Sequence, residues 1–249
     1  MLPGAATGPA GRGGTPAPTT ATVPTAPSPD RLTPPPSGRH RGAVTGLTAV
    51  LALMPVAYLL GTFPAAKLAA RGAGRDVTRE GSGNPGASNV IRLVGWRAGL
   101  LVLLADIGKG AIPSAAGLLL DGHRGAYLLG AAAFLGHVFP VTRRFKGGKG
   151  VATAAGVLLV LFPLIGLGLA ALWFVVARGL KKASVASVLA SVAFPVLVGL
   201  TGGSWGDVIV TGALALAIVV RHVPNLVRLV RGQELDLGEG ASAGTVPPR

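Results

Sequence analysis

The chain has 249 residues, of which 50% are hydrophobic and only 13% are charged, and its mean hydropathy is +0.59. Soluble domains carry about 25% charged residues, so this composition excludes an ordinary soluble domain and indicates an integral membrane protein. The absence of cysteine excludes disulfides and thiolate catalysis, and the net charge of +14 does not indicate nucleic-acid binding, because the cations lie in short clusters between apolar runs.

Residues 1–42 contain ten prolines among Thr, Ala, Gly and Ser, without a periodic apolar pattern. Such a segment cannot bury enough surface to offset its ordering entropy, so we predict a disordered tail. It lacks the charged start and apolar run of a signal peptide. A Pro-rich ligand for a partner domain is the less favoured alternative, because there is no basic PxxP register.

Apolar runs begin at Val44, and each is compared with the roughly 20 residues that span a bilayer core. The uncharged block from Val151 to Ala177 forms either one tilted helix or two short helices that meet at Pro163. The remaining predicted helices cover residues 44–68, with kinks at Pro55 and Pro64, and residues 98–120, 126–141, 184–201 and 207–220.

The positive-inside rule decides between the two alternatives. With two helices at Pro163, nearly all Lys and Arg residues of the loops fall on one side, and only Arg124 lies in a loop on the other. We therefore predict an all-α polytopic protein with seven transmembrane helices, its N-terminus outside and its C-terminus cytoplasmic. Arg39 and Arg41 in the outer tail oppose this orientation mildly. The membrane domain would cover residues 43–234, followed by a short flexible tail at 235–249.

This topology brings three polar segments to the cytoplasmic face. The first, residues 81–92, is rich in Gly, Ser and Asn and ends in Arg92, which suits an anionic ligand; a flexible interfacial turn is the alternative. Its three glycines match the dinucleotide-binding pattern G-x-G-x-x-G. That interpretation fails, because the pattern requires a preceding strand, whereas Asp106, at the expected acidic position, lies within a predicted membrane helix.

The second segment, residues 136–151, places four cationic side chains and a Gly-Gly pair just before a helix, where free backbone NH groups favour an anion. It is not a nucleotide P-loop, because Arg143 replaces the first glycine and Gly150 follows Lys149. A positive-inside cluster punctuated by glycine is the alternative. The third segment contains His222, Asn225 and Arg228, and its alternative is an amphipathic exit helix that meets anionic lipid.

Asp106 and Lys109 are ionisable residues within a predicted membrane helix, where such groups are costly and usually paired. Their spacing of three allows them to pair with each other, which is the interpretation we favour for Lys109. Asp106 has the alternative of positioning a cationic loop residue.

Together these segments resemble the bacterial acyl-phosphate-dependent glycerol-3-phosphate acyltransferase family, PlsY. The resemblance covers about residues 44–234. It rests on GSGNPGASN at 81–89, Asp106 with Lys109-Gly110, GHVFPV at 136–141, FKGGKGVAT at 145–153, and Arg221-His222 followed by Asn225, Arg228 and Glu234. Ser88 departs from the more usual Thr but keeps the hydroxyl, and the N-terminal tail has no part in the resemblance.

The resemblance implies a seven-helix enzyme of the bacterial cytoplasmic membrane, with its active site on the cytoplasmic face. It would transfer a fatty acyl group from acyl phosphate to the 1-hydroxyl of glycerol 3-phosphate and release 1-acylglycerol 3-phosphate and phosphate. No coenzyme A, acyl carrier protein, other cofactor or metal is expected. The implied partners are membrane lipid and an upstream enzyme that produces acyl phosphate, with no nucleic acid.

The resemblance and the chemistry of the segments together give the expected site. Catalytic roles are expected for Ser82, Lys149, His222 and Asn225. Substrate binding is expected for Gly81, Asn84, Ser88, Asn89, Arg92, His137, Lys146, Gly147, Gly148, Gly150, Arg221, Arg228 and Glu234. We expect the donor phosphate at Gly147, Gly148 and Lys149, and glycerol 3-phosphate at Ser82, Arg92 and Lys146.

Acyl phosphate is already a mixed anhydride, so positioning and charge stabilisation would supply most of the rate enhancement. His222 and Asn225 would orient the attacking hydroxyl, whose proton passes to a substrate phosphate or to His222. An acyl-enzyme at Ser82 is an alternative that this chemistry does not need. Two alternatives are a transporter of an organic phosphate, which is disfavoured because no repeat relates the two halves, and a lipid-interacting scaffold without catalysis, which leaves the Gly-rich loops unexplained.

Overall fold

A computed structural model of the chain describes residues 38–238, and of residues 38–45 it describes the backbone only. The predicted tail at 1–42 lies mostly outside the described residues, as does most of the predicted tail at 235–249. Within the described range the regular elements are helices: α1 Gly38–Gly61, α2 Ala65–Gly72, α3 Ala87–Val94, α4 Trp96–Val138, the 3-10 turn η1 Val141–Arg143, α5 Val151–Leu161, α6 Pro163–Gly179, α7 Ala183–Leu200 and α8 Trp205–Val230.

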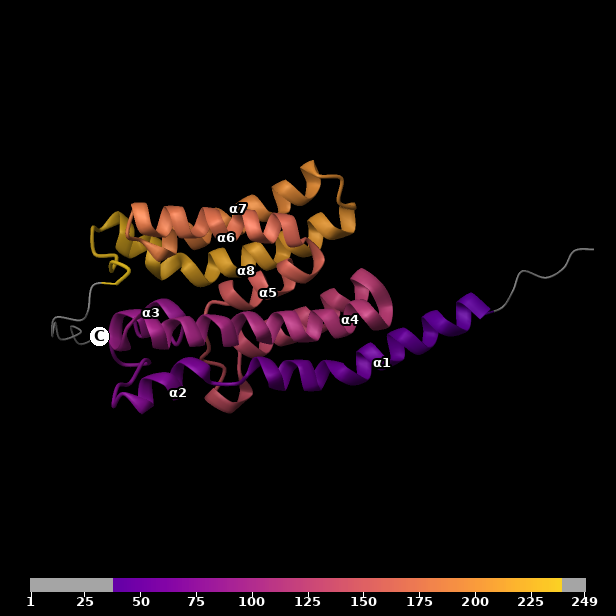
Figure 1. Ribbon diagram of the computed structural model, residues 1–249, viewed down its shortest axis with the longest axis horizontal. Helices are drawn as coiled ribbons and strands as arrows, with labels where there is room; N and C mark the ends of the chain where they lie inside the picture. Colours follow the sequence, from indigo (N-terminus) through magenta and orange to yellow (C-terminus); the bar gives the residue numbers. More distant parts are fainter. Residues whose placement is uncertain (1–37, 239–249) are drawn as a thin grey trace, which may run out of the picture. The chain divides into compact units, whose positions relative to one another are not determined.

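The all-helical, membrane-spanning character predicted from composition is confirmed for this part of the chain. Four stretches are long and apolar enough to cross a membrane, at Gly46–Gly72, Trp96–Arg143, Ala183–Leu200 and Trp205–Val230. α1 lies along α4, α5 contacts both α4 and α6, and α6, α7 and α8 pack together as a second layer (Figure 1). Large apolar side chains, among them Leu119, Leu164 and Leu200, are exposed on the outside of the bundle, as contact with lipid requires.

The long helix α4 is a hairpin of two arms. Asp121 and Gly122 have non-helical backbone angles, and Gly122 has φ +61°, a conformation that glycine adopts without strain. Ser114 Oγ donates a hydrogen bond to the carbonyl of Ala126 at 3.2 Å, which shows that the arms lie side by side. The two apolar runs predicted at 98–120 and 126–141 therefore fold back on each other.

The uncharged block at 151–177 forms two helices that meet at Pro163, as predicted. Phe162 leaves the helical conformation, with φ −137° and ψ 67°, and Pro163 begins α6 at a position that needs no backbone NH. α5 has 11 residues and α6 has 17, so their lengths are about 16 and 25 Å at 1.5 Å per residue. α5 is therefore the shorter of the two helices by about 9 Å.

Glycine allows α4 and α5 to pack with their backbones in contact. A Cβ atom at Gly110 of α4 would collide with the carbonyl of Thr153, and one at Gly156 of α5 would collide with the carbonyl of Ile107. Close approach through small residues is a main means of helix association in membranes, where burial of apolar surface adds little. This packing places the start of α5 beside the buried polar groups of α4.

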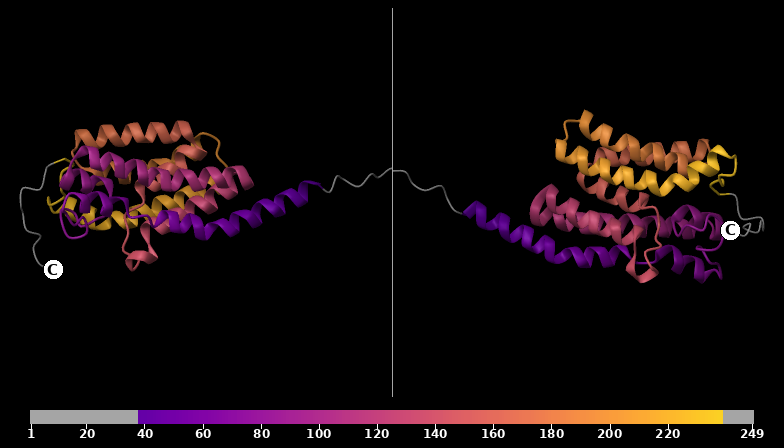
Figure 2. Two further views of the ribbon diagram at one scale, coloured as in Figure 1. Left: turned by 60° about the horizontal axis from the view of Figure 1, so that its bottom comes forward. Right: turned by 180° about the vertical axis from the view of Figure 1, so that it is seen from behind.

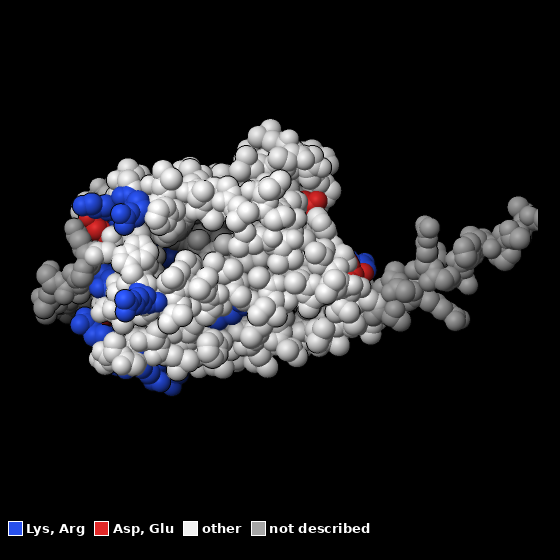
Figure 3. Space-filling view, in the orientation of Figure 1, with Lys and Arg blue, Asp and Glu red and all other residues white. Residues whose placement is uncertain are grey.

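Two ends of the bundle differ in charge. On the face seen in Figure 3, Lys and Arg side chains gather at the end that carries α2, α3 and the C-terminal end of α8, and the middle of this face is almost free of them. Figure 2 shows from two further directions that α2, α3 and the end of α8 share this end. We call it the basic end.

Candidate active site

A cavity of about 420 Å³ opens among α3, α4, α5, α6, α7 and α8. Its polar end is lined by side chains from all three segments that the sequence singled out, including Ser82, Ser88, Arg92, Lys149, His222 and Asn225. The prediction that these segments converge is therefore confirmed. The rest of the lining is apolar, with Leu103, Leu169, Phe194 and Ile218 among its members.

The first polar loop is held in place by Asn89 of α3. Its amide Nδ2 donates to the carbonyls of Val77 and Glu80, each at 3.0 Å, and its Oδ1 accepts from the backbone NH of Ser82 at 2.9 Å. Gly81 has φ +59°, and a Cβ there would collide with this same Oδ1. Asn89 and Gly81 therefore shape the loop, and the loop presents Ser82 to the cavity.

The Gly-Gly pair of the second segment also has a structural task. The NH of Gly148 donates to the carbonyl of His137 at 3.1 Å, and a Cβ at Gly148 would collide with the imidazole of His137. Arg221 Nη2 donates to the carbonyls of Gly147 and Gly148 at 3.2 and 3.3 Å. The pair thus fits into a narrow space between α4 and α8. Contrary to our expectation, neither glycine lines the cavity.

Lys149, which directly follows the Gly-Gly pair, reaches the cavity and begins a chain of polar contacts. Its Nζ donates to Asn225 Oδ1 at 2.5 Å, and Asn225 Nδ2 donates to Glu234 Oε1 at 2.6 Å. Glu234 also pairs with Arg228, whose Nε lies 3.1 Å from Oε2. Glu234 therefore contacts one cation, Arg228, directly and is linked to a second, Lys149, through the neutral amide of Asn225, so positive charge is in surplus at the polar end of the cavity.

The electrostatics of Lys149 follow from this environment. Burial lowers its pKa to about 8, with the nearby charges of Arg228, Arg221 and Arg92 acting in the same direction and Glu234 acting against them. A bound phosphate would oppose this lowering, because its negative charge stabilises the ammonium form. Lys149 also stands just before α5, whose first NH groups lack helical acceptors and favour an anion.

His222 of α8 is buried and lines the same cavity. Its Nδ1 lies 2.8 Å from the carbonyl oxygen of Ile218, which only accepts hydrogen bonds, so Nδ1 carries the proton. In the neutral ring this assigns the lone pair to Nε2. The tautomer makes His222 suited to accept a proton from a hydroxyl group.

Beneath the polar end lies a buried ion pair. Asp106 and Lys109, both about 4% exposed in their side chains, pair at 2.6 Å, which confirms the pairing expected from their spacing. The imidazole of His137 lies 3.7 Å from the Asp106 carboxylate through Nδ1. Asp106 and His137 also line the cavity, whereas Lys109 does not.

The predicted residues divide into two groups. Those that line the cavity are Ser82, Asn84, Ser88, Asn89, Arg92, His137, Lys149, Gly150, His222, Asn225 and Glu234. Those placed outside the lining are Gly81, Lys146, Gly147, Gly148, Arg221 and Arg228. Lys146 is exposed, Arg228 pairs with the lining residue Glu234, and Arg221 bonds to the carbonyls of Gly147 and Gly148. The helix α8 continues through Pro224 and ends at Val230.

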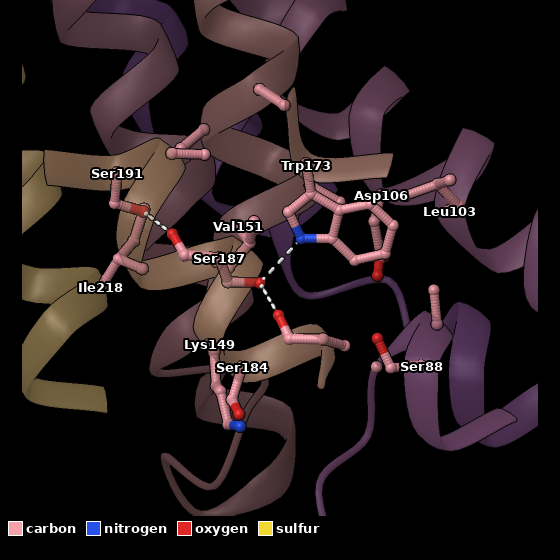
Figure 4. Close-up of a pocket in the computed structure, with 18 of the residues that line it drawn as sticks. Ser88, Leu103, Asp106, Lys149, Val151, Trp173, Ser184, Ser187, Ser191 and Ile218 are labelled. Carbon is pink, nitrogen blue, oxygen red and sulfur yellow. Dashed lines mark hydrogen bonds between the residues drawn. The ribbon is translucent and has the colours of Figure 1, made fainter. Parts of the chain in front are cut away.

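The sequence interpretation missed a wall made by α6 and α7. Trp173, Ser184, Ser187 and Ser191 line the cavity, with Lys149 and Ser184 at one end of it (Figure 4). Trp173 Nε1 donates to Ser187 Oγ at 2.9 Å, and Ser187 and Ser191 donate to carbonyls one turn back on their own helix. The serines lie at i, i+3 and i+7, a spacing that marks one face of a helix and was a signal available in the sequence.

The comparisons with known proteins agree with this geometry. The family model described as "Glycerol-3-phosphate acyltransferase" matches residues 51–232. The chain belongs to this family. A glycerol-3-phosphate acyltransferase of Dechloromonas aromatica is 41% identical over 189 residues, which cover 75% of this chain and 96% of the relative. That of Rubrobacter xylanophilus is 40% identical over 195 residues, with 77% and 96% covered.

Two solved structures are similar to this acyltransferase. One is the crystal structure of PlsY (YgiH), an integral membrane glycerol 3-phosphate acyltransferase, in its glycerol 3-phosphate form, with a TM-score of 0.73 and 34% identity over 76% of this chain and 96% of that one. The other is the lysophosphatidic acid form, with a TM-score of 0.70, 34% identity and coverage of 77% and 96%. The chain is thus an integral membrane glycerol-3-phosphate acyltransferase that acts in phospholipid synthesis.

Proposed function

We propose that this acyltransferase uses acyl phosphate as its donor and transfers the acyl group to the 1-hydroxyl of glycerol 3-phosphate. The observation that carries the proposal is the lining of the cavity, which combines a large apolar part with polar groups that include two cations from different parts of the chain, Lys149 and Arg92. Two phosphate-bearing substrates, of which one has an apolar tail, match this arrangement. The products are 1-acylglycerol 3-phosphate and inorganic phosphate, and no metal or coenzyme takes part.

The chain would cross the membrane seven times, counting the two arms of α4 separately, with its N-terminus outside. The concentration of Lys and Arg at the basic end supports a cytoplasmic position for that end and for the site (Figure 3). The membrane is then the bacterial cytoplasmic membrane. Glycerol 3-phosphate and an acyl phosphate made by an upstream enzyme would both arrive from the cytoplasm.

The donor phosphate is assigned to Lys149 and the start of α5. Ser184 faces the same end of the cavity, and its buried Oγ has no hydrogen-bond partner among the described residues, so it is available to a phosphate oxygen. Gly150 and the residue that follows it line the cavity, which supports a contact through the first NH groups of the helix. The acyl chain would run along the apolar part of the lining, past Trp173.

Glycerol 3-phosphate is assigned to the opposite wall, where Arg92, Ser82 and Ser88 supply a guanidinium and two hydroxyl groups. His222 and Asn225 line the same cavity. Asn225 is linked to the donor side because it accepts a hydrogen bond from Lys149. The 1-hydroxyl attacks the acyl carbonyl carbon, the bond from that carbon to the phosphate oxygen breaks, and the hydroxyl proton passes to His222 Nε2 or to the departing phosphate. Phosphate leaves readily, so orientation and positive charge supply most of the rate enhancement.

The test uses the purified full chain in detergent or lipid nanodiscs with glycerol 3-phosphate and either palmitoyl phosphate or palmitoyl-coenzyme A. We expect lysophosphatidate and stoichiometric phosphate release with the acyl phosphate only. Turnover with the coenzyme A ester and none with the acyl phosphate would refute the donor assignment. Ping-pong kinetics, or an acyl group retained on Ser82, would replace direct transfer by an acyl-enzyme mechanism.

A further inference from the structure

The segment that follows α8 crosses the polar end of the cavity. We call residues 234–237 the strap. Glu234 is buried and Leu235 lines the cavity, although we had expected residue 235 to begin a flexible tail. The strap is tied to three parts of the molecule: α8 through Glu234, the α6–α7 turn, and α3.

On the α3 side the strap holds Arg92. Arg92 donates from Nε at 3.1 Å and from Nη2 at 2.9 Å to the same backbone carbonyl, that of Asp236. Its Nη1 donates to Asn89 Oδ1 at 3.2 Å. Two edges of the planar guanidinium are thus fixed by groups of the protein, which sets the orientation of the side chain in the cavity wall.

On the other side the strap is fixed by the turn between α6 and α7. Lys182 Nζ pairs with the Asp236 carboxylate and also donates to the carbonyl of Glu234 at 2.5 Å. The backbone NH of Leu237 donates to the carbonyl of Lys181 at 2.6 Å. The Lys182 and Asp236 side chains are 27% and 21% exposed, so the pair is partly shielded from solvent. The position of this ion pair decides where the backbone carbonyl of Asp236 meets Arg92.

We propose that Asp236 and Lys182 are positioning residues of the glycerol 3-phosphate site, acting through Arg92. The inference rests on the proposed function, in which Arg92 contacts the phosphate of that substrate. A long flexible side chain loses conformational freedom when it binds an anion, and a guanidinium fixed in advance loses less. The ion pair therefore contributes to affinity for glycerol 3-phosphate without touching the substrate or the donor.

The test compares Asp236→Asn and Lys182→Met with the wild-type full chain. Asp236→Asn keeps the backbone carbonyl and removes the ion pair. We expect it to raise the KM for glycerol 3-phosphate about fivefold, in line with a partly exposed charged contact, with kcat within about twofold and the KM for acyl phosphate unchanged. Calorimetric titration with glycerol 3-phosphate alone should show the same loss of affinity.

The double variant Asp236→Asn/Lys182→Met should bind no more weakly than Lys182→Met alone, because residues that act through one contact are not additive. Lys182→Arg, which keeps the charge, should retain most of the affinity. Asp121→Asn breaks a comparable ion pair with Arg124, measured at 2.6 Å, in the turn between the arms of α4, and should leave both KM values unchanged.

The outcomes separate this inference from the proposed function. Unchanged affinity in Asp236→Asn, or an equal loss for both substrates together with a lowered melting temperature, would overturn the positioning role. Arg92→Gln checks the underlying assignment. If that variant loses affinity and Asp236→Asn does not, only the strap inference fails; if Arg92→Gln also binds normally, the assignment of the phosphate to Arg92 fails.

Discussion

The charge on Lys149 should control the activity of this acyltransferase at alkaline pH. Burial lowers the pKa of Lys149 to about 8, so the ammonium form is present below that pH and is lost as the pH rises through it. The groups that set this value face Lys149 from three elements, with Arg92 on α3, Arg221 and Arg228 on α8 and Glu234 on the strap. If the cation holds the donor phosphate, kcat/KM for acyl phosphate must fall above pH 8.

The size of the effect follows from the titration. With a pKa of about 8, the charged fraction falls about tenfold between pH 7 and pH 9, and kcat/KM should fall by a similar factor. The second ionisation of the glycerol 3-phosphate phosphate, at about pH 6, is complete before this range and does not contribute. Lys149→Arg keeps its charge throughout, so any activity it retains should show no loss in this interval.

The assay measures kcat/KM for acyl phosphate from pH 6.5 to 9.5, with the spontaneous hydrolysis of the donor subtracted at each pH. Lys146→Arg is the matched control, because Lys146 is exposed and lies outside the cavity lining. It should keep the wild-type profile. A wild-type profile that is flat to pH 9.5, or the same alkaline loss in Lys149→Arg, would refute the assignment of the effect to Lys149.

Two further predictions concern the apolar lining of the cavity and the buried ion pair. Phe194 belongs to the apolar lining of the cavity and packs edge to face on Phe162, with ring centroids 6.1 Å apart. Phe194→Leu should therefore favour longer acyl chains, by roughly tenfold in kcat/KM per additional methylene accommodated, when acyl phosphates of increasing length compete. Val198→Ala, one turn further along α7 and outside the lining, should leave the preference unchanged; if it shifts the preference equally, Phe194 is not the limit. Asp106→Asn leaves Lys109 as an uncompensated buried charge and should reduce stability by about 3–5 kcal/mol. The double variant Asp106→Leu/Lys109→Met should recover most of this loss in thermal unfolding, and a single variant as stable as the wild type would show that the pair is not coupled.

Much of the site was predictable because its residues lie in short, chemically distinctive segments. Lys149, His222 and Asn225 were expected to meet, and they line one cavity. The roles of the glycines were not predictable. Whether the NH of Gly148 faces a ligand or the carbonyl of His137 depends on how closely α4 approaches the loop, and no local pattern encodes that distance.

The wall made by Trp173 and the serines of α7 was missed for a related reason. In a membrane, Ser side chains within an apolar helix often bond to their own backbone, as Ser187 and Ser191 do here, so their presence alone does not indicate a site. Only the packing of α6 against α7 turns this face toward Lys149. The strap was missed because its few residues have no apolar period, and their order comes from contacts with residues more than 50 positions away, such as Lys182 to Asp236.

The sequence by itself determined the class of the molecule. Apolar runs of membrane length, the break at Pro163 and the cationic segments follow from local chemistry, because hydrophobic length and backbone constraints act within a few residues. The tertiary structure decided how charge is distributed within the site: Glu234 shared between Arg228 and Asn225, Lys149 half-buried beside the start of α5, and Arg92 held by the strap. These depend on distances between helices, and the packing of the whole bundle sets those distances.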